Sequence, residues 1–146
     1  MGTQENAAVF QRVIDEMVSN GNVDIVDELL APDFVEHNEL PPPMMAASGR
    51  ETAKQVFRVL RATFPDLRAE VRQVVAQGEY VVVFMTWHGT QHGEFLGIPP
   101  TGKAASFGVF DMVRVVDGKI TEHWGIVDQL AMLQQLGALS LPGAGQ

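Results

Sequence analysis

The sequence predicts a single α+β domain, because helical periodicity fills its first half and strand periodicity most of its second half. Up to residue 64, apolar residues recur at the spacing of helices that bury one face. From Leu67 onward, apolar and polar residues alternate, which is the period of half-buried strands. Helices that precede a run of strands favour α+β over a parallel sheet. The length of 146 residues is that of one domain, without repeats or an internal boundary.

Two helices and a short strand are expected before residue 38. The inward positions of the first helix follow helical spacing: Phe10, Val13, Ile14 and Met17. Gly21 is placed to end this helix in a left-handed conformation. A second short helix over 23–30 should stop at Pro32, and 33–37 should form a strand.

A third helix is expected after a proline-rich loop. Three prolines make 38–47 a loop, because proline lacks the backbone donor that helices and strands need. Ser48 and Glu51 have the spacing of a capping box at a helix start. The inward residues of this helix would be Val56, Phe57, Leu60 and Phe64.

An antiparallel meander follows, with one final helix. Its strands are predicted from residue 67 to a turn at 77–78, and then over 79–92, 104–116 and 119–126. Gly93 to Lys103 is expected to be a loop. Asp128 should cap the last helix, although a catalytic role was the alternative, and Gly137 should end it. The ends, 1–6 and 140–146, are expected to fray.

Composition excludes several classes of function. The formal net charge is −8, and the ten Lys and Arg residues are scattered, so neither nucleic acid nor an anionic membrane is an expected partner. No cysteine is present, which excludes disulfides, thiolate metal sites and thiol nucleophiles. No signal peptide and no apolar run of about 20 residues is found, so a cytoplasmic location is expected.

Four segments stand out in order along the chain: APDFVEHN (31–38), ATFPDL (62–67), GEFLGIPPTGK (93–103) and RVVDGKITEHWGIVDQLAMLQQLG (114–137). Together these segments resemble the SnoaL-like polyketide cyclases, also called ester cyclases, of the nuclear-transport-factor-2-like superfamily. The resemblance covers nearly the whole chain. It implies a cone-shaped, curved antiparallel sheet covered by N-terminal helices, with an apolar pocket and no cofactor. It is less specific for the reaction, because this fold hosts many activities.

The residues for catalysis are redistributed relative to the family. The resemblance implies an acid/base aspartate two residues after His123 in the last strand, where this chain has Gly125. A family histidine in the preceding strand corresponds to Asp111. In the segment that usually reads G-T-H-x-G, Gln91 stands in place of the histidine and His92 follows.

Asp111 is the main catalytic candidate on chemical grounds. It shares a strand face with Val109 and other apolar residues, so its carboxylate must find a partner or have its pKa raised by desolvation. A two-residue turn at 117–118 would place Asp111 opposite Trp124. A three-residue turn with a glycine bulge, which we prefer, would place it opposite His123 and pair Phe110 with Trp124. A structural Asp–His hydrogen bond is the alternative to catalysis.

His123 is the second catalytic candidate, expected to shuttle a proton together with Asp111. His37 is the third, expected to polarise or orient a substrate oxygen, because it ends the first strand just before the proline-rich loop and so would lie at the pocket mouth. Ketosteroid isomerases place a general base at roughly this point, by topological analogy. The alternative is a half-exposed histidine bonded to Glu36, Asn38 or a backbone carbonyl.

The expected substrate-binding residues come from strands and loops around the pocket: Trp87, Gln91, His92, Val109, Met44, Phe57 and Leu96. Trp87 could instead fill the core, and the loop methionines and Leu96 could form a lid or a dimer contact. His88 and His92 lie about 13 Å apart on a strand, too far to share a metal ion, so no metal site is predicted. Ser106 has no base at a readable spacing, so a serine hydrolase is not supported.

These features together predict an acid/base enzyme without a cofactor. Its substrate would be a hydrophobic molecule with a carbonyl or ester group, as in cyclase or isomerase chemistry. The alternatives are a hydrolase, hydratase or hydroxylase, a non-catalytic binder of an apolar ligand, and a protein-interaction domain. Phe110, Met112 and Trp124 share the outer sheet face, which predicts a homodimer.

Overall fold

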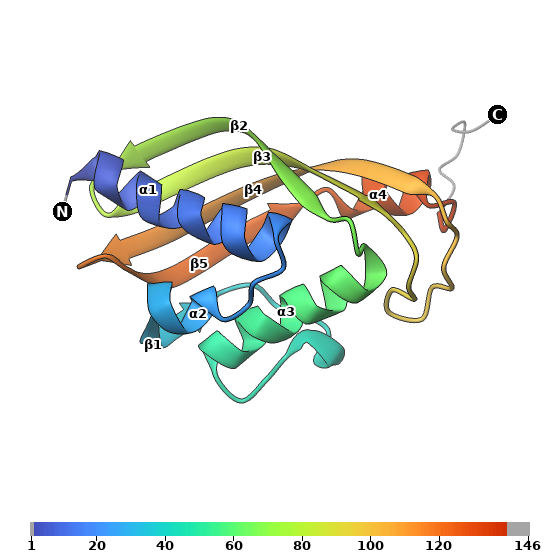
Figure 1. Ribbon diagram of the computed structural model, residues 1–146, viewed down its shortest axis with the longest axis horizontal. Helices are drawn as coiled ribbons and strands as arrows, with labels where there is room; N and C mark the ends of the chain where they lie inside the picture. The colour runs from blue at the N-terminus through green and yellow to red at the C-terminus, as the bar shows by residue number, and fades with distance from the viewer. Residues whose placement is uncertain (1, 140–146) are drawn as a thin grey trace.

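The computed structural model describes residues 2–139, so the C-terminal end expected to fray (140–146) lies outside the described residues. These residues form a single α+β domain in which helices pack into a curved five-stranded sheet (Figure 1). No helix in residues 2–139 is long and apolar enough to cross a membrane. The cytoplasmic location stays a prediction.

The N-terminal helices bury the expected apolar face. Helix α1 (Thr3–Val13) continues directly into a π-helical segment, η1 (Ile14–Ser19), and Gly21 follows with a φ of 73°. The predicted inward residues are all buried: Phe10, Val13, Ile14 and Met17. Helix α1 includes residues 3–6 of the N-terminal end that was expected to fray. Helix α2 (Ile25–Leu29) ends before Pro32, as predicted.

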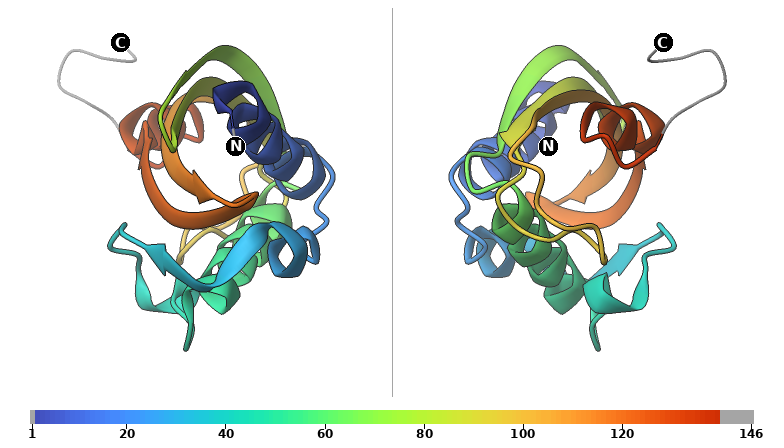
Figure 2. Two further views of the ribbon diagram at one scale, coloured as in Figure 1. Left: turned by 90° about the vertical axis from the view of Figure 1, so that its left-hand side faces the viewer. Right: turned by 90° about the vertical axis from the view of Figure 1, so that its right-hand side faces the viewer.

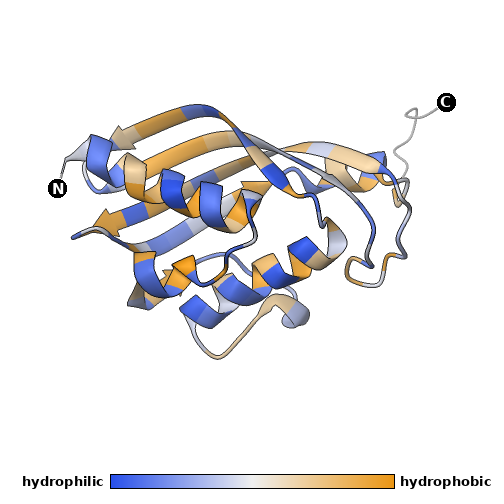
Figure 3. Ribbon diagram, in the orientation of Figure 1, coloured by the Kyte–Doolittle hydropathy of each residue, from blue (hydrophilic) through white to orange (hydrophobic). Residues whose placement is uncertain are grey.

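Helix α3 (Gly49–Thr63) starts at the predicted cap, where the Ser48 hydroxyl accepts a hydrogen bond from the Glu51 backbone N–H at 3.2 Å. In the preceding loop, a single 3-10 turn, η2 (Pro42–Met44), buries the Met44 side chain. In Figure 3, hydrophobic and hydrophilic stretches alternate along α1 and α3. Both helices therefore present one apolar face to the sheet.

The sheet is mixed rather than wholly antiparallel. Its strands are β1 (Leu30–Glu36), β2 (Arg68–Gln77), β3 (Tyr80–Thr90), β4 (Ala104–Val116) and β5 (Lys119–Val127), in the order β1-β5-β4-β3-β2. Strands β2 to β5 form the predicted meander, but β1 joins β5 in parallel. The meander pattern could not reveal this pairing, because β1 comes from a distant part of the chain.

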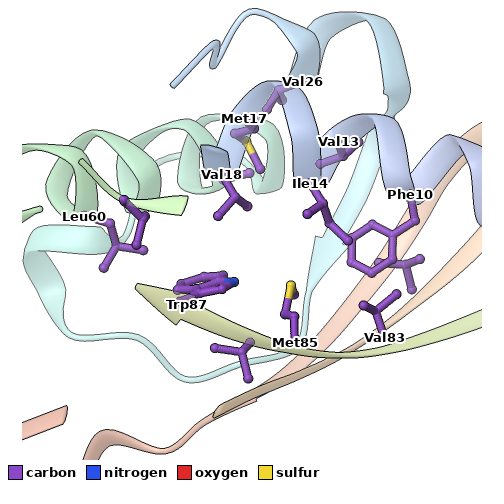
Figure 4. Packing of buried hydrophobic residues seen from close by; sticks show 14 of the residues in the cluster. Phe10, Val13, Ile14, Met17, Val18, Val26, Leu60, Val83, Met85 and Trp87 are labelled. Carbon is purple, nitrogen blue, oxygen red and sulfur yellow. The ribbon is translucent and has the colours of Figure 1, made fainter. Parts of the chain in front are cut away.

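The sheet curls into a cone around the apolar core. Seen from its two ends, the strands wrap around α1, while α3 lies across the open side and α4 (Gln129–Gln135) covers one end (Figure 2). The Asp128 side chain accepts a hydrogen bond from the Ala131 N–H, which confirms that it caps α4. Figure 4 shows side chains of α1 and η1 facing Val83, Met85 and Trp87 of β3 across the interior.

The β4–β5 register differs from both sequence alternatives. The turn has two residues, Asp117 and Gly118, both with positive φ, as in the favoured tight hairpins. A bulge between Ile120 and Glu122 then shifts the register by one residue. Asp111 therefore lies opposite Gly125, and Phe110 lies opposite Ile126. The preferred three-residue turn was wrong. The observed bulge nevertheless places His123 on the same side of the sheet as Asp111, as that turn would have done.

Candidate functional site

A pocket lies inside the cone, between the helices and the concave face of the sheet. Its walls are mostly apolar side chains from α1, η1, α3 and the inner strand positions. The polar lining residues are few: Glu36, Asn38, Asp111, His123 and Gln129. An apolar pocket with a few convergent polar groups is the usual form of a small-molecule site.

Three of these polar residues form a continuous hydrogen-bonded cluster. His123 Nε2 lies 2.9 Å from Asp111 Oδ1, and His123 Nδ1 lies 2.7 Å from Glu36 Oε2. The Asp111–His123 contact runs diagonally across the β4–β5 hairpin, since Val113 is the register partner of His123. The predicted pairing of Asp111 with His123 is thus present, through a different register.

His123 is charged at neutral pH. Burial alone lowers the pKa of His123, but the charge of Asp111 and the hydrogen bonds to Asp111 and Glu36 outweigh burial and raise this pKa to about 10. An imidazolium has two N–H donors, so His123 can serve both carboxylates at once. The cluster holds the Asp111 side chain in place beside the apolar cavity.

The floor of the cluster is the backbone of Gly125. The Asn38 side-chain oxygen accepts a hydrogen bond from the Gly125 N–H at 2.9 Å. A Cβ atom on Gly125 would lie only 2.5 Å from Asp111 Oδ1 and 3.2 Å from Asn38 Nδ2. The Asp111 carboxylate and the Asn38 amide therefore meet above this glycine. No acceptor for Asn38 Nδ2 is found in residues 2–139.

Glu36 and Asn38 line the pocket but were not among the residues predicted from the sequence. Alternation along the end of β1 could have found them, because Phe34 is buried and side chains two residues apart lie on one face. Glu36 and Asn38 therefore point inward with Phe34. Neither residue was chosen from the sequence, because His37 lies between them and histidine is the more familiar acid/base residue.

His37 is not placed in the pocket, and its predicted position at the pocket mouth is wrong. Since it alternates with Glu36 and Asn38, its side chain points to the other face. There His37 Nε2 lies 3.0 Å from Glu122 Oε1, and the ring stacks on Trp124 with centroids 4.4 Å apart. The environment of His37 fits the alternative better, that of a half-exposed histidine bonded to a carboxylate. The carboxylate is that of Glu122 rather than Glu36.

The predicted substrate-binding residues divide into two groups. Those that line the pocket are Trp87, Met44 and Phe57. Val109 is fully buried in the core without lining the pocket, and His92 and Leu96 are exposed. In the expected loop lid, Phe95 rather than Leu96 reaches the pocket.

Gln91 has a structural position outside the pocket. Its amide nitrogen donates to the carbonyl oxygens of Gly93 and Pro99 at 3.2 Å, and its oxygen accepts from the Thr101 hydroxyl at 2.8 Å. Gln91 is completely buried. It therefore ties together the loop between β3 and β4 instead of facing a substrate.

Ser106 has a histidine beside it that its spacing in the sequence did not reveal. His88 is its register partner in β3, with His88 Nδ1 2.7 Å from Ser106 Oγ and His88 Nε2 3.0 Å from Glu70 Oε1. This group lies on the outer sheet face, away from the residues that line the pocket. Within residues 2–139, no three His, Asp or Glu side chains form a metal-binding group.

A protein-family model described as SnoaL-like polyketide cyclase matches residues 8–136. Among curated relatives, the nogalonic acid methyl ester cyclase of Streptomyces nogalater is 32% identical over 124 residues, which cover 82% of this chain and 88% of that protein. The aklanonic acid methyl ester cyclase DnrD of Streptomyces peucetius is 31% identical over 111 residues, covering 75% and 72% of the two chains.

Solved structures share the fold over nearly the whole chain. TsrD from Streptomyces laurentii superposes with a TM-score of 0.83 at 28% identity and covers 95% of this chain and 99% of its own. IdmH from Streptomyces antibioticus has a TM-score of 0.76 at 36% identity and covers 90% and 98%.

Proposed function

Because the chain belongs to the SnoaL-like polyketide cyclase family, we propose that it is a cofactor-independent acid/base enzyme for a hydrophobic substrate with carbonyl or ester groups. The observation that carries this proposal is the Asp111 carboxylate, held by the His123 imidazolium at the wall of an apolar pocket. The two curated relatives are called nogalonic and aklanonic acid methyl ester cyclases, and the family is described as polyketide cyclases. An aromatic polyketide ester is therefore the substrate class we favour.

In this proposal Asp111 is the base. Its Oδ1 accepts from His123, while Oδ2 has no hydrogen-bond donor in residues 2–139. Oδ2 takes a proton from a carbon next to a substrate carbonyl, and the C–H electron pair becomes an enolate. The enolate carbon attacks a second carbonyl of the same molecule. Asp111 then returns the proton to the alkoxide, so a ring closes with one C–C bond formed and no atom lost.

The developing negative charge needs donors inside the dry pocket. Asn38 Nδ2 lies above Gly125 beside Asp111 and is free to donate to an enolate oxygen. The His123 imidazolium adds a positive charge next to the reacting carbon. Fixed donors of this kind can supply much of an enzyme's rate enhancement. In this scheme Asn38 takes the substrate-orienting role expected of His37.

A binding protein without turnover is the second candidate. It is favoured by the pairing of both His123 nitrogens, which leaves the imidazolium no free N–H or lone pair for proton transfer. Hydrolysis, hydration or hydroxylation remain alternative reactions of the same pocket. They differ from ring closure because their products gain the atoms of water or an oxygen atom.

Asp111→Asn tests the proposal. Nogalonic and aklanonic acid methyl esters, the compounds in the relatives' names, serve as substrates, and 2-tetralone serves to follow α-proton exchange in D2O. We expect a cyclised product of unchanged mass from wild type and at least a ~100-fold lower rate from the variant, as for loss of a general base. Ser106→Ala is the matched control and should keep full activity. Ligand binding without turnover in wild type would instead identify a binder.

We also propose a homodimer through the outer face of β4 and β5. Phe110 is 51% exposed and Ile126 is 74% exposed, and the two lie opposite each other in the sheet. Phe84 stacks on Phe110 with centroids 4.5 Å apart, which extends the apolar area to β3. Contiguous apolar surface of this kind commonly marks a protein interface.

A further inference from the structure

The indole nitrogen of Trp87 is a buried hydrogen-bond donor without a partner. Trp87 lies on the inner face of β3, is only 5% exposed and lines the pocket. Its Nε1 atom is fully buried and has no hydrogen-bond partner in residues 2–139. The only other such side-chain atom in this part of the chain is Asn6 Oδ1, which does not line the pocket.

The indole ring is held by aromatic neighbours that offer it no acceptor. The ring meets Phe57 edge to face with centroids 5.8 Å apart, and it meets Phe107 similarly at 6.2 Å. Figure 4 shows the ring between Leu60 and Met85, with its nitrogen on the side toward Met85 and the interior of the cluster. Phenylalanine would fill this position without burying an N–H, so the unpaired donor is a cost to the empty protein.

We propose that the Trp87 Nε1–H donates a hydrogen bond to an oxygen of the bound ligand, a carbonyl or quinone oxygen. Buried polar groups are nearly always paired in native structures. The remaining lining near Trp87 is apolar, so an oxygen carried by the ligand satisfies this donor. Tryptophan has a donor and no acceptor, so it distinguishes a carbonyl from a ring carbon at this point.

This oxygen is distinct from the one at the reacting carbon. Asp111 is the register partner of Val83, and Trp87 lies four residues further along β3, about 13 Å of strand. A ligand that reaches both residues must be elongated and carry oxygens at two separate places. The inference deepens the proposed function, since it describes the substrate of the same pocket, but the contact itself requires no turnover.

Nuclear magnetic resonance of protein labelled with 15N-tryptophan tests the contact directly. The chain has two tryptophans, and Trp124→Phe assigns the two indole N–H signals. The probes are 1-tetralone and tetralin, which share a fused ring system and differ in one carbonyl oxygen. We expect 1-tetralone to move the Trp87 indole proton signal downfield, as hydrogen bonding does, and tetralin to leave this proton shift nearly unchanged.

Affinity measurements with Trp87→Phe provide the second readout. We expect the variant to bind 1-tetralone about 2- to 10-fold more weakly, the usual range for one neutral hydrogen bond, with unchanged tetralin affinity. Equal losses for both probes would show that the indole only packs against ligands. An indole signal that responds alike to both probes, or to neither, would overturn the inference.

Asp111→Asn separates this inference from the proposed function. The variant should retain the 1-tetralone shift of the Trp87 signal while losing turnover. If wild-type protein shows the 1-tetralone shift of the Trp87 signal but never turns over substrate, the proposed enzymatic function is refuted and the Trp87 contact still holds. Turnover without any carbonyl-specific shift would refute the contact alone.

Discussion

The carboxylate of Asp111 lies directly over the backbone of Gly125, its register partner in the neighbouring strand. A Cβ atom at position 125 would lie 2.5 Å from Asp111 Oδ1 and 2.9 Å from His123 Cε1. Both distances are shorter than non-bonded atoms tolerate. A side chain at position 125 and the observed Asp111 geometry are therefore mutually exclusive.

This steric conflict explains why a chain with Asp111 in β4 has glycine at position 125, where the family resemblance implies an aspartate. The family resemblance implies a carboxylate carried by position 125 of β5, whereas this chain carries one on β4, aimed at the space above the same backbone. Under the proposed function, the acid/base carboxylate thus reaches a similar place from the other strand of the hairpin. Gly125 and Asp111 act as one unit, which neither residue reveals by itself.

We expect Gly125→Ala to reduce catalytic rate at least ~10-fold, because the added methyl group displaces the Asp111 carboxylate from His123 and each ~1.4 kcal/mol of lost transition-state stabilisation is tenfold in rate. The unfolding free energy should fall by roughly 1–3 kcal/mol, the usual cost of overpacking. Gly108→Ala is the matched control. A Cβ atom there meets only Phe84 Cε1, at 3.5 Å. Equal rates for the two variants would contradict the expected role of Gly125.

Stability should fall as pH rises above neutrality, because the pKa of His123 is about 10 in the folded protein and near its ordinary value of 6.5 in the unfolded chain. The folded state therefore holds the proton more tightly. This contribution is fully present below pH ~6.5 and is lost progressively up to pH ~10. It is on the order of a few kcal/mol, since each unit of pKa is worth about 1.4 kcal/mol.

Urea unfolding at several pH values between 6 and 10 measures this contribution. His123→Gln should be less stable than wild type at pH 6, and its stability should change less over this range. A wild-type unfolding free energy that stays constant from pH 6 to 10 would contradict a charged, doubly bonded His123. Direct observation of the His123 ring signals by nuclear magnetic resonance provides an independent measure of its pKa.

Glu36 and His37 are neighbours in sequence, but their side chains point to opposite faces of the sheet. Variants of the two residues therefore separate effects on the pocket from effects on the outer face. Glu36→Gln removes one of the two charges that hold His123, so we expect a lower His123 pKa and a fall in activity of roughly 10-fold or more. His37→Gln changes only the outer face, where the ring contacts Glu122 and Trp124. It should leave turnover within about 2-fold of wild type. Comparable losses of activity in both variants would show that His37 contributes to the site.

The fold could be predicted well because its periodic signals are strong. The alternation on each side of Asp111 identified β4 with its observed bounds, and the spacing around Phe10 and Met17 identified the buried helix face. The parallel pairing of β1 with β5 left no local signal, because only the assembled core brings the two strands together.

The site could be predicted only in part. The contact of Asp111 with His123 was predicted because a carboxylate on an apolar strand face is costly unless it has a partner. The bulge beside Thr121 was invisible in sequence, so the exact register of the Asp111–His123 contact was missed. Glu36 was missed because its importance depends on which way β1 faces. Gln91 was mistaken for a binding residue because its partners lie in a loop whose path the sequence does not define.

The outer face of β4 and β5 offers the last prediction, since it can be tested without a substrate. Ile126→Asp places a charge on the most exposed large apolar side chain of the described residues, next to Phe110. In a dimer this charge would be buried without a partner, which is strongly unfavourable, so the equilibrium should shift to monomer. Leu130→Asp is the control, because Leu130 is 48% exposed but lies on α4, away from this face. Light scattering at micromolar concentration should give a dimer for wild type and the control and a monomer for Ile126→Asp; a monomeric wild-type protein would refute the interface.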